Sequence, residues 1–184
     1  MTEERSTRIE AGPVVQRFGS LVAVRLGLSE EQRLRSVSAL NRLLAHAIAL
    51  SDLYRKAHWQ TSGPMFYELH LLYDKHREGQ LSLADALAER VQSLGGVSLA
   101  LARDISAESR LVRAPSGIES ALDQLKHLAE AHEFILIEAR PLAREAASAG
   151  DEGTNDLIVS QVVRLNELQS WFIHRHLDSR GGHA

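Results

Sequence analysis

Hydrophobic residues recur every three or four positions along most of the chain, which is the spacing of one face of an α-helix. The clearest series comprises Leu34, Val37, Leu40, Leu44, Ala47, Ile48 and Tyr54. The four residues before it, Ser29 to Gln32, follow a capping-box pattern, in which serine and glutamine side chains bond the first free amides of a helix. The pattern therefore predicts a first helix over about 30 to 60.

The same spacing predicts a second helix after the Gly63-Pro64 break, because proline suits the first position of a helix. This helix is expected to end at Gly95-Gly96, since glycine favours helix termini. Gly79 and Ser82 are weak points at which it could divide in two. Residues 97–116 have little periodicity and predict a long crossover that carries one short helix near 99–104.

A second capping box, Ser116 to Glu119, predicts the start of a third helix that continues to about 148. Pro141 lies inside it and is expected to kink or split it, because proline removes a backbone hydrogen bond. The segment Gly150 to Thr154 predicts a turn that ends in the N-cap of a fourth helix, which runs to about 178.

Four long helices with one long crossover predict an all-α, ferritin-like four-helix bundle. The expected domain organisation is an N-terminal arm at 1–28, the bundle at 29–178 and a short C-terminal tail at 179–184. Hydrophobic residues make up 44% of the 184 residues and charged residues 24%, a balance typical of a globular protein. No apolar stretch is long enough to predict a membrane span, and the first residues lack the apolar core of a secretory signal, so we expect a cytoplasmic protein.

Candidate chemistry gathers at five residues on the first two helices: His58, His70, Asp74, Asp85 and Glu89. Histidine and carboxylate side chains together suit divalent iron, manganese or zinc. His70 and Asp74 are four residues apart and therefore share one helix face, and Asp85 and Glu89 repeat that spacing.

Helix geometry restricts how these residues can combine. On a continuous helix Asp74 and Asp85 are about 16 Å apart and His70 and Glu89 about 28 Å, which is too far for one metal site. All four nevertheless fall within an arc of about 100°, so two antiparallel copies of the helix would bring the two pairs together. Such a two-fold contact predicts two equal metal sites between subunits. The alternative is a solvated face on which the acids pair with nearby arginines, Arg77 and Arg90.

A wider resemblance favours the metal interpretation. The relevant segments are Lys56-Ala57-His58-Trp59, Gly63-Pro64-x-Phe66, Leu69-His70-x-x-Tyr73-Asp74-x-His76, Asp85-x-x-Ala88-Glu89-Arg90-x-x-x-Leu94-Gly95-Gly96, Gly150 to Thr154 and Trp171-Phe172-x-x-x-His176-Leu177. Over residues 35–178 the chain resembles the Dps family, the mini-ferritins named as DNA-binding proteins from starved cells. The Glu-x-x-His ligand motif of the larger ferritins is absent from the sequence.

The resemblance implies a ferroxidase, an oxidoreductase that acts on metal ions. In that family His58, His70 and Asp74 of one subunit would meet Asp85 and Glu89 of its two-fold mate at a di-iron centre, with Glu89 as the bridging ligand. Fe(II) would be oxidised to Fe(III), preferentially by hydrogen peroxide, and stored as ferric mineral in a hollow dodecamer that protects the cell from oxidative stress. Zinc could compete for the same ligands.

Other polar residues have two interpretations each. Trp59 would lie beside the centre or simply pack the bundle edge. His76, His174, His176 and His183 could add metal ligands, although polar residues on an exposed last turn explain the last three equally. His127 and His132 are expected to be structural or on the surface. Glu119, Asp123 and Glu130 lie where related shells place acids around iron-conducting pores, but a solvated helix face would look the same.

DNA binding is not expected to come with the family resemblance. The net charge is −3, and residues 1–28 hold four arginines against three glutamates and no lysine. Phosphate contacts dominate sequence-independent DNA affinity, so such an arm predicts little binding. The alternative functions are a DNA-condensing structural shell with little redox activity and a zinc-binding helical shell.

Overall fold

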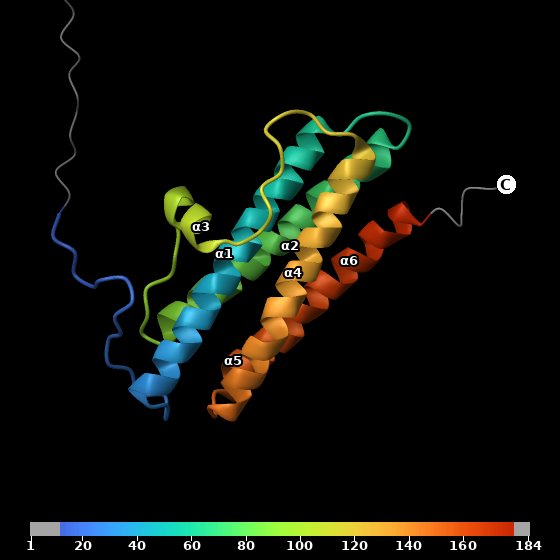
Figure 1. Ribbon diagram of the computed structural model, residues 1–184. Helices are drawn as coiled ribbons and strands as arrows, with labels where there is room; N and C mark the ends of the chain where they lie inside the picture. Colours follow the sequence, from blue (N-terminus) through green and yellow to red (C-terminus); the bar gives the residue numbers. More distant parts are fainter. Residues whose placement is uncertain (1–11, 179–184) are drawn as a thin grey trace, which may run out of the picture.

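The four long helices are present in the computed structural model, which describes residues 12–178 (Figure 1). The elements are α1 (Glu30–Gln60), α2 (Phe66–Ser93), α3 (Ala102–Glu108), α4 (Ala121–Ser148), α5 (Glu152–Leu157), the π-helix η1 (Ile158–Val163) and α6 (Arg164–Leu177). The helix α1 runs antiparallel to α2, and α4 runs antiparallel to the stretch formed by α5, η1 and α6 (Figure 1). The described part of the chain contains no strand, which confirms the all-α class.

The ends of α1 and α2 agree with the predicted signals. The Ser29 side chain accepts a hydrogen bond from the backbone N–H of Gln32 at 3.2 Å, and the Gln32 side chain accepts one from the backbone N–H of Ser29 at 2.7 Å. This reciprocal capping box starts α1 at Glu30. The helix α2 is continuous from Phe66 to Ser93, so neither Gly79 nor Ser82 divides it.

The third predicted helix begins later than expected. Its N-cap is Ser120, whose hydroxyl accepts from the N–H of Asp123 at 3.1 Å, so Ser116 to Glu119 belong to the crossover. Of the two expected effects of Pro141, a kink or a split, the split is wrong, because α4 continues through the proline to Ser148. Buried residues on both sides of it, Ala139 and Leu142, pack the helix onto the core and offset the lost hydrogen bond.

Two further predictions need correction. The short crossover helix α3 spans Ala102–Glu108 instead of 99–104. The fourth helix is interrupted by the π-helix η1 over Ile158–Val163, which the hydrophobic spacing did not predict. A π-helix is rare and contains a wider turn than the α-helices on either side of it.

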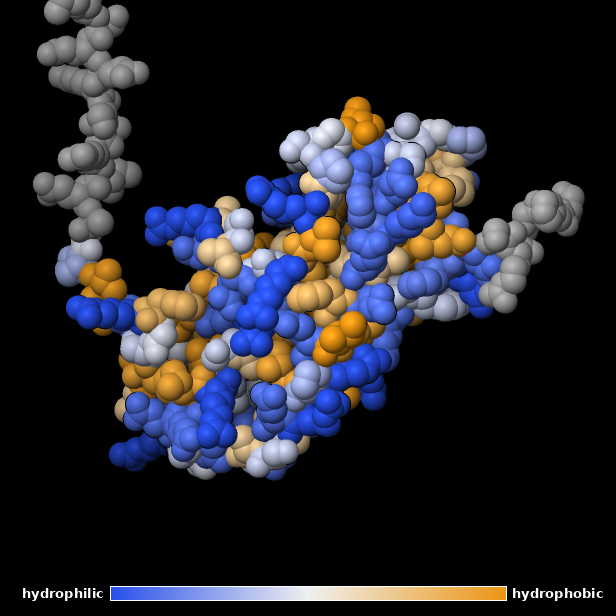
Figure 2. Space-filling view, viewed as in Figure 1, coloured by the Kyte–Doolittle hydropathy of each residue, from blue (hydrophilic) through white to orange (hydrophobic). Residues whose placement is uncertain are grey.

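The core lies between the two helix pairs. Its largest fully buried side chains are Tyr54, Tyr73, Leu40, Leu43, Leu44, Leu50, Leu69, Leu87, Leu94, Leu125, Leu128 and Ile135. Several polar side chains are buried with them, both near the ends of the bundle and between them. On the outer face seen in Figure 2, hydrophobic residues are scattered among hydrophilic ones, as on most globular proteins. No helix within residues 12–178 is long and apolar enough to cross a membrane.

Residues 12–28 form no helix and pass along the end of the bundle. The N–H of Val22 donates to the carbonyl of Gly95 at 2.9 Å, and Arg33 donates to the carbonyls of Val22 and Leu94 at 3.0 and 2.9 Å. Part of the predicted arm is thus bonded to the end of α2. The rest of the arm, residues 1–11, and the predicted tail at 179–184 lie outside the described residues.

Candidate metal centre

The turn between α1 and α2 brings His58 and His70 together. It is built around Gly63, whose φ of +95° belongs to the left-handed region that glycine adopts most easily. The N–H of Thr61 donates to the carbonyl of Ala57 at 2.8 Å and ends α1. The N–H of Phe66 donates to the carbonyl of Gly63 at 3.0 Å and starts α2. The last turn of α1 therefore lies directly beside the first turns of α2.

Each of the two imidazoles donates a hydrogen bond to the backbone of the other histidine. Nδ1 of His58 donates to the carbonyl of His70 at 2.9 Å, and Nδ1 of His70 donates to the carbonyl of His58 at 3.0 Å. The rings stack with their centroids 3.7 Å apart. A carbonyl oxygen can only accept, so both Nδ1 atoms carry hydrogen, and in the neutral form of each ring Nε2 has a free lone pair. This is the tautomer and the type of second contact found for histidines that bind metals.

The three candidate carboxylates lie on the exposed side of α2. Asp74 is half-buried and one turn beyond His70, whereas Asp85 and Glu89 are exposed near the other end of the helix. Because α2 is unbroken, Asp74 and Asp85 are about 16 Å apart along its axis. Within residues 12–178, no three histidine or acidic side chains of one chain are grouped closely enough to hold a metal ion. One chain thus presents two separate sets of candidate ligands, His58, His70 and Asp74 near one end of α2 and Asp85 and Glu89 toward the other.

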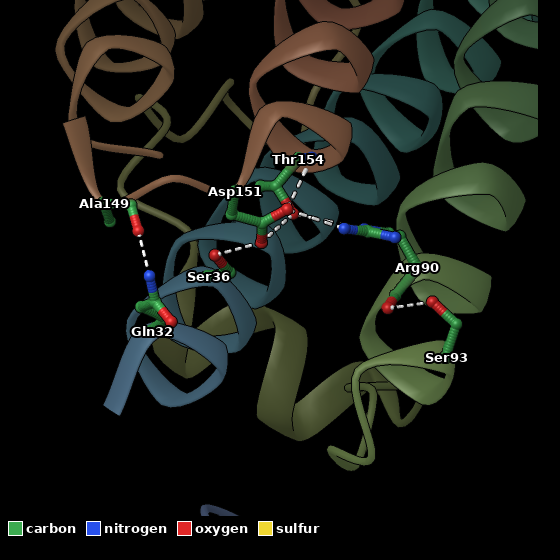
Figure 3. A network of polar contacts seen from close by, with 7 residues as sticks. All are labelled: Gln32, Ser36, Arg90, Ser93, Ala149, Asp151 and Thr154. Atoms are coloured by element: carbon green, nitrogen blue, oxygen red, sulfur yellow. Dashed lines mark hydrogen bonds and ion pairs between the residues drawn. The ribbon is translucent and has the colours of Figure 1, made fainter. Parts of the chain in front are cut away.

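A buried network fixes the helix end that carries Glu89. Its neighbour Arg90 donates from Nη2 to Oδ1 of Asp151 at 2.7 Å and from Nε to the hydroxyl of Thr154 at 3.2 Å. Asp151 also accepts from the hydroxyl of Ser36 at 2.6 Å and from the N–H and hydroxyl of Thr154 at 3.0 and 2.7 Å. Figure 3 shows this carboxylate at the meeting point of α1, α2 and α5.

The charge of Asp151 is maintained by these partners. Burial raises the pKa of the carboxyl, but the hydrogen bonds from Ser36 and Thr154 and the charge of Arg90 together lower it below the ordinary value of 3.8. Asp151 is therefore ionised at neutral pH and holds α2 to the start of the last helical stretch. The sequence analysis placed Asp151 in a turn and in a segment that carries the family resemblance, and missed this role.

Other predicted residues are placed away from the ligand groups. His76 is buried, and its Nδ1 lies 3.0 Å from the hydroxyl of Tyr54, so it faces the core and is not an additional ligand beside Asp74. His132 is also fully buried, 2.5 Å from the same hydroxyl, which confirms a structural place for it. Burial lowers the pKa of His76 to about 4 and that of His132 to about 3, so both are neutral at physiological pH.

The acids considered for a pore differ in their surroundings. Glu119 is largely buried and pairs with Lys56 at 2.5 Å and with Nδ1 of His127 at 2.6 Å. Asp123 and Glu130 are exposed on α4, and Asp123 serves the cap of that helix through Ser120. Glu119 therefore joins the crossover to α1 and α4 within one chain.

The remaining candidates are mostly near the surface. Trp59 is 72% exposed, and the guanidinium of Arg55 lies 5.6 Å from its ring centroid, so the indole extends outward beside His58. His174 is exposed and donates to the carbonyl of Ser170 at 2.9 Å, and His176 is half-buried on the same last turn. His183 lies outside the described residues.

The sequence analysis also missed buried amides in the core. Gln80, Asn166 and Gln169 are almost fully enclosed and bond to one another and to buried histidines. Their positions follow the hydrophobic register of α2 and α6, and this register is the signal that could have identified them.

Comparisons with known proteins agree with the helical fold. Residues 37–180 match the Ferritin-like domain family. The DNA protection during starvation protein of Agrobacterium fabrum is 30% identical over 144 residues, which cover 78% of this chain and 88% of the relative.

Solved structures extend the comparison. DpsC from Streptomyces coelicolor is 45% identical, with a TM-score of 0.89 over 90% of this chain and 96% of that one. A Dps protein from Vibrio cholerae, described as a member of a broad superfamily of ferritin-like diiron-carboxylate proteins, is 25% identical, with a TM-score of 0.79 over 86% and 99% of the two chains. The match to the ferritin-like family over most of the chain, together with these Dps relatives, shows that the protein belongs to the Dps family of ferritin-like proteins.

Proposed function

We propose that this protein is a mini-ferritin that oxidises Fe(II), preferentially with hydrogen peroxide, at di-iron centres between subunits and stores the ferric product in a hollow dodecamer. The ligands of each centre would be His58, His70 and Asp74 of one subunit and Asp85 and Glu89 of its two-fold mate. The observation that carries the proposal is the unbroken helix α2, which holds His70 and Asp74 on the same face as the other two carboxylates but too far from them to meet within one chain.

A two-fold axis that crosses α2 near its middle would complete the centre. Antiparallel pairing of two copies brings the histidine end of each helix to the carboxylate end of the other, and the contact repeats itself to give two equal sites. Both carboxylates of the second group, Asp85 and Glu89, are exposed in the isolated chain and are therefore accessible to a partner.

The residues suit Fe(II) as a substrate that must bind and then leave. Two imidazole Nε2 atoms, with their tautomer fixed by the backbone carbonyls, supply neutral nitrogen ligands. The three carboxylates compensate charge and favour the Fe(III) product. Two Fe(II) ions held together can give two electrons to one hydrogen peroxide, which avoids the one-electron step that releases hydroxyl radical. A cytoplasmic location is part of this proposal, because relatives are named for protecting DNA.

The first experiment combines size with chemistry. The metal-free protein is separated by size with light scattering, and the peak then receives anaerobic Fe(II) followed by one pulse of hydrogen peroxide. We expect a shell of about twelve subunits, built from two-fold dimers, that gains ferric absorbance much faster than buffer. A shell without acceleration would contradict the ferroxidase proposal and favour a DNA-condensing or zinc-binding shell. A monomer would contradict the intersubunit centre.

Complementation between two inactive variants tests whether the centre is shared. The variants His58→Ala and Glu89→Ala should each assemble but oxidise Fe(II) slowly. When both chains are co-expressed with different tags and mixed shells are purified, each mixed dimer contains one centre with both changes and one intact centre. Random pairing therefore restores about a quarter of the centres. A centre within one chain would restore none. Glu68→Ala, an exposed acid on another face of α2, is the matched control and should oxidise iron normally.

A further inference from the structure

Tyr54 lies at the centre of a buried hydrogen-bond chain that the proposed iron centre does not use. Its hydroxyl is 2.5 Å from Nε2 of His132 on α4 and 3.0 Å from Nδ1 of His76 on α2. His132 continues the chain through Nδ1 to Oδ1 of Asn166 on α6 at 2.8 Å. One tyrosine thus connects α1 to the other three long helical segments of the bundle.

The hydrogen positions along this series of hydrogen bonds follow from the contacts of Asn166. The amide nitrogen of Asn166 donates to the carbonyl of Val162 at 2.7 Å, so Oδ1 of Asn166 is an acceptor. Nδ1 of His132 must therefore carry hydrogen, which leaves Nε2 of the neutral ring as a lone pair. The Tyr54 hydroxyl donates its single hydrogen to that lone pair and accepts from Nδ1–H of His76.

Two amides strengthen this assignment. Gln80 donates from Nε2 to Oε1 of Gln169 at 2.8 Å and to Oδ1 of Asn166 at 3.3 Å. Gln169 donates in turn to the carbonyl of His76 at 3.0 Å. The oxygen of Asn166 therefore receives two donors, which holds the hydrogen on Nδ1 of His132 and leaves its Nε2 lone pair directed at the Tyr54 hydroxyl.

Tyr54 differs from Tyr73, the other buried tyrosine, because its hydroxyl has a hydrogen-bond acceptor. The hydroxyl of Tyr73 has no hydrogen-bond partner among the described residues, so a proton released from it would have nowhere to go. Burial raises the pKa of both phenols and disfavours a tyrosinate at either position. Tyr54 can still lose an electron, because its proton can move at the same time along an existing hydrogen bond to His132.

We propose that Tyr54 is a redox-active tyrosine that supplies the second electron when hydrogen peroxide meets a centre holding only one Fe(II). This inference rests on the proposed ferroxidase function. In the step, Fe(II) gives one electron and Tyr54 the other, the O–O bond of hydrogen peroxide breaks to give two hydroxide ions, and the phenolic proton passes to Nε2 of His132. The products are Fe(III), a neutral tyrosyl radical and an imidazolium, so charge and atoms balance.

The location of Tyr54 suits electron transfer without contact. It lies one helical turn, about 6 Å along α1, before the proposed ligand His58. Its ring centroid is also 6.1 Å from that of Tyr73, which adjoins the proposed ligand Asp74. Electrons tunnel through such short stretches of protein, whereas the proton needs the direct contact that His132 provides. The step would supply the second electron that a single Fe(II) lacks, and so would avoid the one-electron reduction of hydrogen peroxide that releases hydroxyl radical.

The radical itself is the main readout. Metal-free shells receive one Fe(II) per centre and excess hydrogen peroxide, are frozen within a second or less, and are examined by electron paramagnetic resonance. We expect a tyrosyl signal that narrows when the protein contains ring-deuterated tyrosine, which identifies the residue type without any mutation. The chain has three tyrosines, so single changes to phenylalanine assign the radical. The signal should be lost in Tyr54→Phe and retained in the matched variants Tyr67→Phe and Tyr73→Phe.

Two further measurements separate redox chemistry from structural support. The variant His132→Gln keeps Tyr54 but lacks a base of comparable strength, and most of the tyrosyl signal should disappear. With one Fe(II) per centre, Tyr54→Phe should release more spin-trapped hydroxyl radical than the wild type, while its oxidation rate at two Fe(II) per centre stays unchanged. Light scattering confirms that the variants assemble.

Each outcome has one meaning. A tryptophan radical, no radical in shells that oxidise Fe(II) rapidly, or a tyrosyl radical that survives in Tyr54→Phe would overturn the inference. If Tyr54→Phe fails to assemble, a wild-type signal that does not narrow on deuteration contradicts the inference, and a narrowed signal retained in both Tyr67→Phe and Tyr73→Phe assigns the radical to Tyr54 by elimination. Failure of the ferroxidase proposal is recognised separately, since wild-type shells would then show no acceleration at two Fe(II) per centre.

Discussion

Replacing Asp151 by alanine should destabilise the bundle more than any exposed substitution. The change removes the N-cap of α5 and leaves Arg90, which is held between α2 and α5, without its charge partner. Breaking a fully buried pair costs about 3–5 kcal/mol. Asp151 is buried but the Arg90 side chain is 26% exposed, so we expect a cost near the lower end, about 3 kcal/mol. For a chain of this length that corresponds to a fall of about 6–12 °C in the unfolding midpoint. The control Ser36→Ala removes one neutral donor to the same carboxylate and should cost only about 1 kcal/mol.

Scanning calorimetry of the metal-free protein measures this difference. All variants must be compared at one protein concentration, because the midpoint of an oligomer depends on it. If Asp151→Ala lowered the midpoint no more than Ser36→Ala, the carboxylate would not be the tie between α2 and α5 that the structure indicates.

The pH dependence supplies an independent check through Asp151→Asn, which keeps the shape of the cap but loses the charge. The folded pKa of Asp151 lies below its ordinary value of 3.8. The stability that ionisation adds is therefore complete above about pH 4 and is lost as the pH falls through the folded pKa. The gap in midpoint between wild type and Asp151→Asn should be full at neutral pH and should close in strong acid. A gap that stays constant down to the lowest pH would refute this assignment.

Further predictions concern the end of α2, the candidate metal centre, a core histidine and DNA binding. Gly95→Ala should lower the unfolding midpoint, because Gly95 has φ of +83° and a Cβ there would lie 2.6 Å from the carbonyl oxygen of Val22; calorimetry checks this. Asp85→Lys should slow initial Fe(II) oxidation more than Asp85→Asn in a stopped-flow absorbance assay, because it sets a positive charge against the metal. The folded pKa of His132, about 3, lies below the unfolded value of 6.5, so stability should fall as the pH drops below 6.5. His132→Gln should show a shallower fall in acid titrations followed by circular dichroism. Gel shifts at physiological salt should detect little DNA binding, since the net charge is −3, and tight retention would contradict this.

The sequence predicted the long helices because their signals are local. The capping box at Ser29 and the break at Gly63-Pro64 act through neighbouring residues, so they can be recognised without knowing the fold. The third helix shows where such reasoning ends. Both Ser116 and Ser120 are followed by an acid three positions later, but Glu119 pairs across the bundle with Lys56 and His127 and is not available to cap a helix. Only the tertiary contact decides between the two starts.

The candidate centre was predictable in part for the same reason. The separation of Asp85 and Glu89 from His70 and Asp74 along one helix already predicts that a metal site using all four would need a second copy. The reciprocal bonds between His58 and His70 could not be predicted, because they depend on how the turn at 61–65 returns the chain. Buried polar residues such as His132 were also difficult to place, since periodicity shows which helix face they occupy but not whether a hydrogen-bond partner lies opposite them in the core.

The π-helix η1 sets the rotational phase of everything after it. An α-helix turns about 100° per residue, and a wider π turn absorbs one additional residue without lengthening the following helix by a full step. Removing one residue from 158–163 would therefore restore a regular helix and leave α6 in nearly the same rotational phase relative to the bundle. Asn166 and Gln169 would then stay in the core, and exposed neighbours such as Glu167 would stay outside it. This segment holds one residue more than a regular helix needs, so a single-residue deletion should be better tolerated here than in the middle of the unbroken helix α2.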